Sequence, residues 1–135
     1  MEFFLVSEDV SVDQQTNRMS LFNVIEQLAS PSFPFPLLYA ASVSLWVAED
    51  DDDEGKDYQC ILRILLPDGI KHDFPTNFTF KTRRHRIITR IQGIPITKPG
   101  LLQFEILLNG KHHATHEIDI LQIDPNELLP AAETI

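Results

Sequence analysis

The sequence predicts an all-β protein, an antiparallel two-sheet β-sandwich of about 7–9 strands. The strongest evidence is the Asn109-Gly110 pair, which lies between two segments in which apolar and polar residues alternate. This dipeptide favours the tight turn of a β-hairpin. Similar short alternating segments, separated by turn-forming residues, fill most of the remaining chain, so we expect almost no helix.

The first strand is predicted over residues 2–12, with an apolar face that Glu8 interrupts. A polar turn at residues 13–17 leads into a return strand at residues 19–25. Residues 29–36 contain three prolines, which lack the backbone donor that a central strand needs. We therefore predict a connection there, which carries the chain from one sheet to the other.

A longer strand is predicted over residues 37–48. Odd-numbered residues from Tyr39 to Val47 are apolar and share the expected core face, so Ser44 and Trp46 take the opposite face. We expect this outward Trp46 to pack under a neighbouring loop. Ligand binding by the exposed indole is the alternative.

Acidic residues fill 49–54, and so many like charges predict a solvated hairpin loop. The return strand at residues 58–66 contains Cys60 in an apolar run, where we expect it to act as a small buried hydrophobe. A short strand at residues 70–74 follows. Another spans residues 78–94, with a basic interruption and a bulge or strand end near its close.

The Asn-Gly hairpin completes the body of the domain. We predict one sandwich domain over residues 1–123 and a short helical turn and loose tail over residues 124–135. A chain of 135 residues with 43% apolar and 23% charged residues is ordinary for one globular domain.

The formal net charge of −9 disfavours nucleic acid and anionic membrane as partners. The single cysteine excludes an internal disulfide, and the first residues lack the basic segment of a signal peptide. These features together predict a cytoplasmic location.

Three clusters are candidate sites. Carboxylates of the acidic loop suggest calcium, with a ligand from a second loop if the loops meet at one end. The residues concerned are Asp50, Asp51, Asp52, Asp53 and Asp68. The plainer interpretation is a loop that keeps a hairpin solvated. The basic cluster Arg83, Arg84 and Arg86 suits a solvated edge strand, or else a docking site for an acidic partner.

The third cluster is His112, His113 and His116, which strand geometry separates. Neighbouring side chains point to opposite faces, and His112 and His116 would stand about 13 Å apart on one face. We therefore expect no zinc site. No nucleophile, phosphate-loop or dinucleotide motif occurs, so we predict a protein that is not an enzyme and needs no cofactor.

Two parts of the sequence form a recognisable pattern. One is the segment Glu8-Asp9-Val10-x-Val12-Asp13-x-x-Thr16-Asn17-x-x-Ser20-Leu21-Phe22-Asn23-Val24, and the other is the closing Pro99-Gly100 strand with the Asn109-Gly110 turn. This pattern resembles a family of small bacterial and phage proteins of unknown function. The resemblance covers nearly the whole chain. It implies a single-domain sandwich similar to immunoglobulin-like and C2-like modules, and it supplies no activity or site residues.

We predict a non-enzymatic protein-interaction module whose partner is another protein or a second copy of the chain. The interaction candidates are Arg83, Arg84, Arg86, Trp46, Glu49 and Glu54. The alternative is a calcium- or carbohydrate-binding module, with the acidic loop as metal ligand and Trp46 or Tyr39 as the surface on which a sugar stacks.

Overall fold

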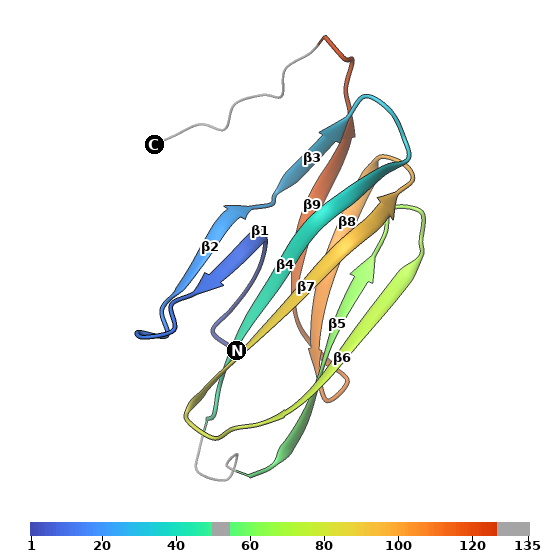
Figure 1. Cartoon of the computed structure of the whole chain (residues 1–135). Helices are drawn as coiled ribbons and strands as arrows, with labels where there is room; N and C mark the ends of the chain where they lie inside the picture. The colour runs from blue at the N-terminus through green and yellow to red at the C-terminus, as the bar shows by residue number, and fades with distance from the viewer. Residues whose placement is uncertain (50–54, 127–135) are drawn as a thin grey trace.

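The computed structural model describes residues 1–49 and 55–126 and folds them into two facing β-sheets (Figure 1). One sheet has the strand order β2-β1-β4-β7 and the other β3-β9-β8-β5-β6. The nine strands are β1 (Phe3–Val12), β2 (Met19–Val24), β3 (Gln27–Ser30), β4 (Phe35–Val47), β5 (Asp57–Leu65), β6 (Lys71–Thr79), β7 (Arg84–Ile96), β8 (Gly100–Leu108) and β9 (Lys111–Gln122). The predicted all-β sandwich is confirmed. Within these residues no helix has the length and apolar character to cross a membrane.

The hairpin of β8 and β9 forms as the sequence predicts. Asn109 and Gly110 have φ angles of 48° and 82°, and a two-residue turn of this kind needs positive values at both positions. Leu102, Phe104 and Ile106 on β8 are buried. They pack in the interior with buried isoleucines of β9, so the predicted alternation is correct across the hairpin.

One pair of strands departs from the predicted antiparallel pattern, because β3 runs parallel to β9. The segment predicted as a connection overlaps β3 at its start and β4 at its end, and residues 31–34 between them carry the chain from one sheet to the other, as predicted. An earlier crossing, from β2 to β3, occurs over two residues. Ile25 N donates to Val6 O in the first sheet, and Glu26 O accepts from Asp119 N in the second.

Trp46 lies in the main core between the sheets, and its prediction as an outward side chain is wrong. It is 2% exposed and contacts the ring of Phe78, with 6.4 Å between the ring centroids. Its Nε1 donates to Ser44 Oγ over 2.9 Å, so the indole buries its one polar atom with a partner.

The first sheet is also covered on its outer face. Val10, Ala41 and Val43 form a second buried cluster there, against which residues of β2 and β7 pack. The cover is the β1–β2 hairpin, which Arg86 and Arg90 of β7 bond to across this face. The middle of β4 is therefore buried on both faces, which explains why apolar character alone gave the wrong inward face for this strand.

Two irregularities interrupt the first sheet on neighbouring strands. Glu8 and Asn23 are missing from the β1–β2 register, and Leu38 and Gly93 from the β4–β7 register. Asn23 and Gly93 have φ angles of 55° and 72°, a conformation that these two residue types tolerate best. Such irregularities bend strands and redirect side chains.

The chain after β9 is described only as far as Asn126. Asp124 Oδ1 accepts a hydrogen bond from Asn126 N over 3.1 Å, within a turn. The rest of the predicted helical turn and tail lies outside the described residues.

Candidate functional site

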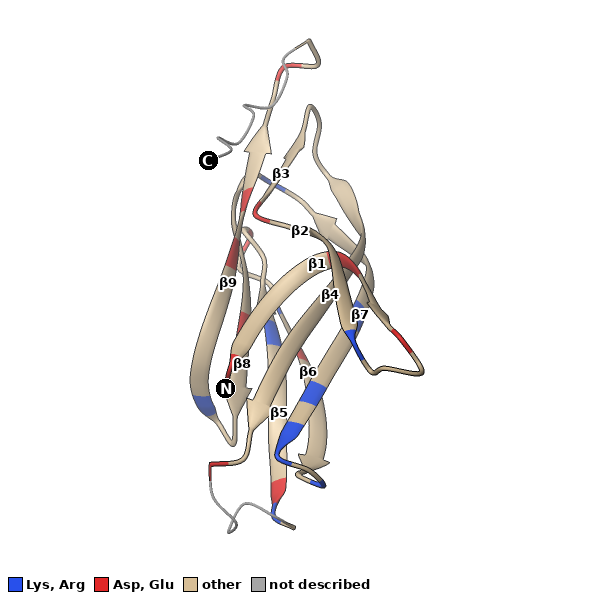
Figure 2. Cartoon of the chain, turned by 90° about the vertical axis from the view of Figure 1, so that its left-hand side faces the viewer, with Lys and Arg blue, Asp and Glu red and all other residues tan. Residues whose placement is uncertain are grey.

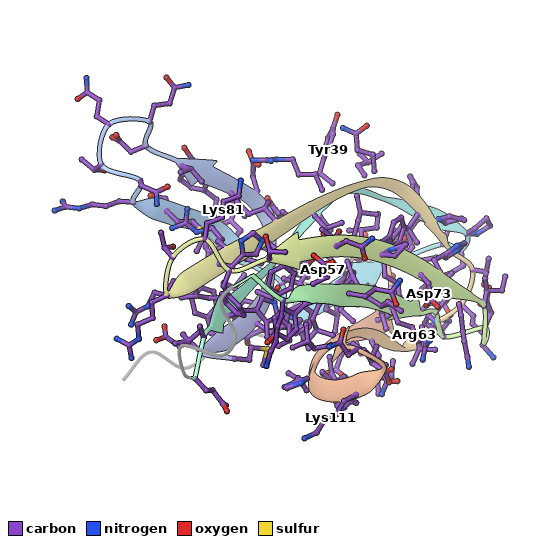
Figure 3. The ribbon with its side chains drawn as sticks, turned by 90° about the horizontal axis from the view of Figure 1, so that it is seen from below. Tyr39, Asp57, Arg63, Asp73, Lys81 and Lys111 are labelled. Atoms are coloured by element: carbon purple, nitrogen blue, oxygen red, sulfur yellow. The ribbon has the colours of Figure 1, made fainter. Side chains whose placement is uncertain are left out.

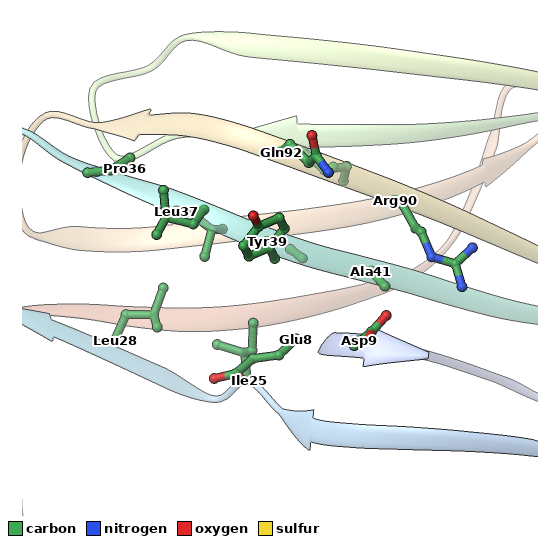
Figure 4. A pocket seen from close by; sticks show the side chains of 13 residues that line it. Glu8, Asp9, Ile25, Leu28, Pro36, Leu37, Tyr39, Ala41, Arg90 and Gln92 are labelled. Atoms are coloured by element: carbon green, nitrogen blue, oxygen red, sulfur yellow. The ribbon is translucent and has the colours of Figure 1, made fainter. Parts of the chain in front are cut away.

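A groove lies beside β4 (Figure 4). We call it the β4 groove, and its volume is about 620 Å³. Its lining comes from the bend in β1, the start of β3, the first half of β4 and the middle of β7. The residues that line it include Glu8, Asp9, Ile25, Leu28, Leu37, Leu38, Tyr39 and Arg90.

The groove exists because β1 leaves β4 early. β1 pairs with β4 from Phe3 opposite Leu45 to Ser7 opposite Ala41, and it then turns outward at Glu8. On the other side of Ala41, β4 has six further residues, Phe35 to Ala40, and β7 is their only neighbouring strand among the described residues. The β4 groove occupies the space beside these six residues, where β1 would lie if it continued to pair with β4.

Apolar side chains dominate this groove. Ile25 and Leu37 are 4% and 6% exposed and belong to the main core, whereas Leu38 and Tyr39 are 60% and 63% exposed. Tyr39 projects from the ribbon when the molecule is seen from below (Figure 3). A single exposed apolar residue is ordinary, but two adjacent ones beside an apolar hollow form a surface that binding would bury.

The rim at the β1 end is acidic. Glu8 Oε2 accepts from Asn23 Nδ2 over 3.1 Å, and Asp9 Oδ1 accepts from the backbone N of Val10 over 2.8 Å. Arg90 lies opposite and donates from Nη2 to Val10 O over 2.9 Å, which fixes the β1–β2 hairpin to β7. Figure 2 shows further acidic positions along the neighbouring β9.

The basic cluster lies elsewhere, at the start of β7. Arg84 forms an ion pair with Glu2 over 3.0 Å, and Arg86 donates to the side chain and backbone of Asn17 at the hairpin tip. These two predicted docking residues therefore serve contacts within the chain. The prediction that this stretch belongs to an edge strand is confirmed, since β7 is the outer strand of its sheet.

Of the candidates in and near the acidic loop, Glu49 and Asp68 are described, and neither lines the groove. Ala48 N donates to Arg83 O, so the beginning of this loop and the basic cluster meet within one chain. Glu49 is described and exposed. Asp50, Asp51, Asp52, Asp53 and Glu54 lie outside the described residues.

Asp68 lies in the turn after β5, whereas the acidic loop precedes that strand. The nine residues of β5 span about 30 Å, which separates this turn from the end of β5 that follows the acidic loop. Asp68 is also engaged: its carboxylate accepts from Ile70 N and Thr97 Oγ1, and these bonds lower its pKa. Among the described residues no group of three or more His, Cys, Asp or Glu is placed to hold a metal.

The three histidines of the C-terminal hairpin have separate surroundings. His112 Nε2 contacts Thr115 Oγ1, His116 Nε2 donates to Ile25 O, and the His113 ring lies edge-on to Trp46 at 5.0 Å. Burial lowers the pKa of His113, and nearby positive charge adds to the effect.

A second histidine, the half-buried His85, packs against the same aromatic cluster. His85 stacks on Phe78 at 4.4 Å between ring centroids. Burial, with a contribution from Lys81, lowers its pKa. Both shifts favour the neutral form of the ring, and each ring packs against an aromatic side chain.

Cys60 is buried as predicted, at 2% exposure. Burial raises the pKa of its thiol to about 11. The nucleophilic thiolate is therefore scarce near neutral pH.

Sequence reasoning placed Tyr39 on the core face of its strand, and this is wrong, since the side chain is 63% exposed. It otherwise named Tyr39 only as a sugar-stacking residue and did not find Leu38. The usable signal is the run Leu37-Leu38-Tyr39, three consecutive large side chains that break the alternation after Pro36. Asn23 likewise is exposed and bonded to Glu8, so it contributes to the bend beside the groove.

Comparison with known families places the chain in context. The model of a family described as "Family of unknown function (DUF6941)" matches residues 2–121. No curated protein matches the chain.

Proposed function

Since this chain belongs to DUF6941, a family of unknown function, we propose from its own geometry that it is a non-enzymatic protein-interaction module that binds its partner in the β4 groove. The observation that carries the proposal is the exposure of Leu38 and Tyr39, 60% and 63%, beside the apolar hollow. A few anchor residues, among which Tyr is enriched, supply most of the energy of protein interfaces.

The polar groups of the groove support binding rather than catalysis. Glu8, Asp9 and Arg90 each hold a hydrogen bond to the fold itself. Their side chains fix the bend of β1 and the position of the hairpin, and they leave no acid and base paired across the hollow. A single buried thiol supports placing the module in a reducing compartment such as the cytoplasm.

The carbohydrate alternative keeps one supporting residue. Tyr39 has the exposure that sugar stacking needs, but Trp46, the other candidate, is in the core. The calcium alternative rests on residues 50–53, outside the described part of the chain. We therefore prefer a protein partner.

Site-specific photo-cross-linking in the native host tests this proposal. A benzoylphenylalanine placed at Tyr39 is compared with one placed at Phe74, an aromatic residue 37% exposed on β6 of the other sheet. We expect a discrete cross-linked species from position 39 and none from position 74.

The species must also depend on the groove. Leu38→Asp should abolish it, whereas Ile70→Asp, which changes an apolar residue 52% exposed in the β5–β6 turn, should leave it intact. Equal cross-linking from both positions, or a species indifferent to Leu38→Asp, would disprove the groove as the binding site.

A further inference from the structure

The first half of β4 has a free backbone edge as well as an apolar surface. Residues Phe35 to Ala40 pair with β7 on one side, and within residues 1–49 and 55–126 no strand pairs with them on the other. Backbone polar groups of a strand point alternately to its two neighbours. Some N–H and C=O groups of this segment therefore point into the β4 groove, where another strand would satisfy them.

Two outer strands of the sandwich, β6 and β7, are protected in ways that this edge is not. β6 has Pro75 in its interior, with Lys71 and Asp73 nearby, and β7 has arginines along its length. Charges and prolines of this kind discourage pairing with another chain. In β4 the four residues after Pro36 are all uncharged, and two of them are large exposed side chains.

We propose that an extended segment of the partner protein adds to β4 as a strand along residues 35–40, with a basic residue at the end of the segment that meets Glu8 and Asp9. This inference rests on the proposed function and specifies how that partner is recognised. Six residues of β-strand span about 20 Å, so a short linear segment suffices. Main-chain hydrogen bonds would give affinity, and alternate side chains would enter the hollow lined by Ile25, Leu28 and Leu37.

Charge selects a basic partner over a second copy of this chain. Glu8 and Asp9 line the β1 end of the groove, and Glu26, which directly follows the lining residue Ile25, is exposed. Arg90 is the cation of the lining. A second copy would bring a net charge of −9 and the same acidic rim to this surface, so repulsion would oppose it.

The test uses a phage-displayed library of random linear peptides, each about twelve residues long so that it can cover the six-residue edge. The intact chain is the bait. We expect enrichment of peptides with alternating apolar residues and a Lys or Arg at one end. A selected peptide should bind about tenfold more weakly to the double variant Glu8→Gln/Asp9→Asn, because the charge attraction is lost. Binding to Ile70→Asp should be unchanged.

Two further measurements report strand addition directly. The bound peptide should slow hydrogen exchange of backbone amides within residues 37–40. N-methylation of alternate peptide amides in one register should abolish binding, while methylation in the other register should be tolerated, because only one set of amides faces β4.

The outcomes separate this inference from the proposed function. Peptides that tolerate methylation in both registers, or that leave the exchange of residues 37–40 unchanged, overturn strand addition even if Tyr39 still cross-links to a partner. Failure to enrich any groove-dependent peptide also overturns it. Cross-links from Tyr39 to a second copy would overturn the basic partner. Absence of any specific cross-link from Tyr39 would remove the proposed function itself.

Discussion

The hydrogen bond between Trp46 and Ser44 provides the sharpest test of how the core is built. Both side chains are 2% exposed, and Trp46 Nε1 donates to Ser44 Oγ over 2.9 Å. Ser44→Ala removes the acceptor but leaves the indole N–H buried. A buried donor without a partner costs about 1–3 kcal/mol, so we expect the free energy of unfolding to fall by about 2 kcal/mol. For a domain of this size that corresponds to about 4–8 °C in melting temperature.

A double-mutant cycle with Trp46→Phe isolates the bond from the packing. Trp46→Phe alone removes the donor and leaves a small gap, so it is also destabilising. In the Trp46→Phe background, Ser44→Ala no longer leaves a buried N–H without a partner, so its effect on the free energy of unfolding should be smaller. We expect a coupling energy of about 1 kcal/mol between the two sites.

Urea unfolding followed by far-UV circular dichroism measures all four proteins, since the chain has a single Trp and fluorescence cannot report on Trp46→Phe. Ser20→Ala on the exposed side of β2 is the control, and it should change stability by less than about 0.5 kcal/mol. Additive effects of the two substitutions, with coupling below about 0.5 kcal/mol, would refute the inward placement of Trp46.

Other predictions address separate parts of the fold. Burial lowers the pKa of His85 and of His113. The stability that these rings give in their neutral form is therefore complete above about pH 6.5 and is lost as the pH falls through their lowered pKa values. Urea unfolding should show a lower free energy of unfolding at pH 5 than at pH 7.5, and His113→Gln should reduce that difference. Arg90→Met removes the bond from β7 to the backbone of β1, so amides of the β1–β2 hairpin should exchange faster by mass spectrometry while those of β8 and β9 do not change. Gly110→Ala places a side chain on a backbone with a φ of 82°, so the free energy of unfolding measured in urea should fall by about 1 kcal/mol. The added Cβ would meet no atom within 4 Å, so no new contact offsets this loss. Cys60, with a pKa of about 11 through burial, should react with a thiol reagent only as fast as the chain unfolds, and rapid labelling of the native protein would contradict its burial.

The parts of the fold that the sequence predicts correctly are local. The β8–β9 hairpin depends on Asn109, Gly110 and the alternation beside them, so a short window contains the whole signal. Cys60 is similar, because its apolar neighbours already indicate burial. In contrast, β3 was taken for a connection because its pairing partner lies on β9, far along the chain.

The face of β4 was wrong for a different physical reason. Ala41 and Val43 are buried as their character suggests, but in the outer cluster beneath the β1–β2 hairpin. Trp46 and Ala40 fill the main core instead. When both faces of a strand are covered, alternation no longer tells which face meets the opposite sheet. The β4 groove was missed for a related reason, since its position depends on where β1 leaves β4.

The outer cluster and the β4 groove have one common cause. β1 cannot both cover the outer face of the sheet through Val10 and continue to pair with the first half of β4, because Glu8 and Asn23 bend the hairpin away immediately after Ser7. The bend buries Val10, Ala41 and Val43, and the apolar area removed from water offsets the hydrogen bonds that β4 forgoes along its free edge. A partner strand that adds to this edge would replace the lost pairing without disturbing the outer cluster. The free edge is therefore compatible with a stable unbound protein, and the fold can keep it open until a partner strand pairs with it.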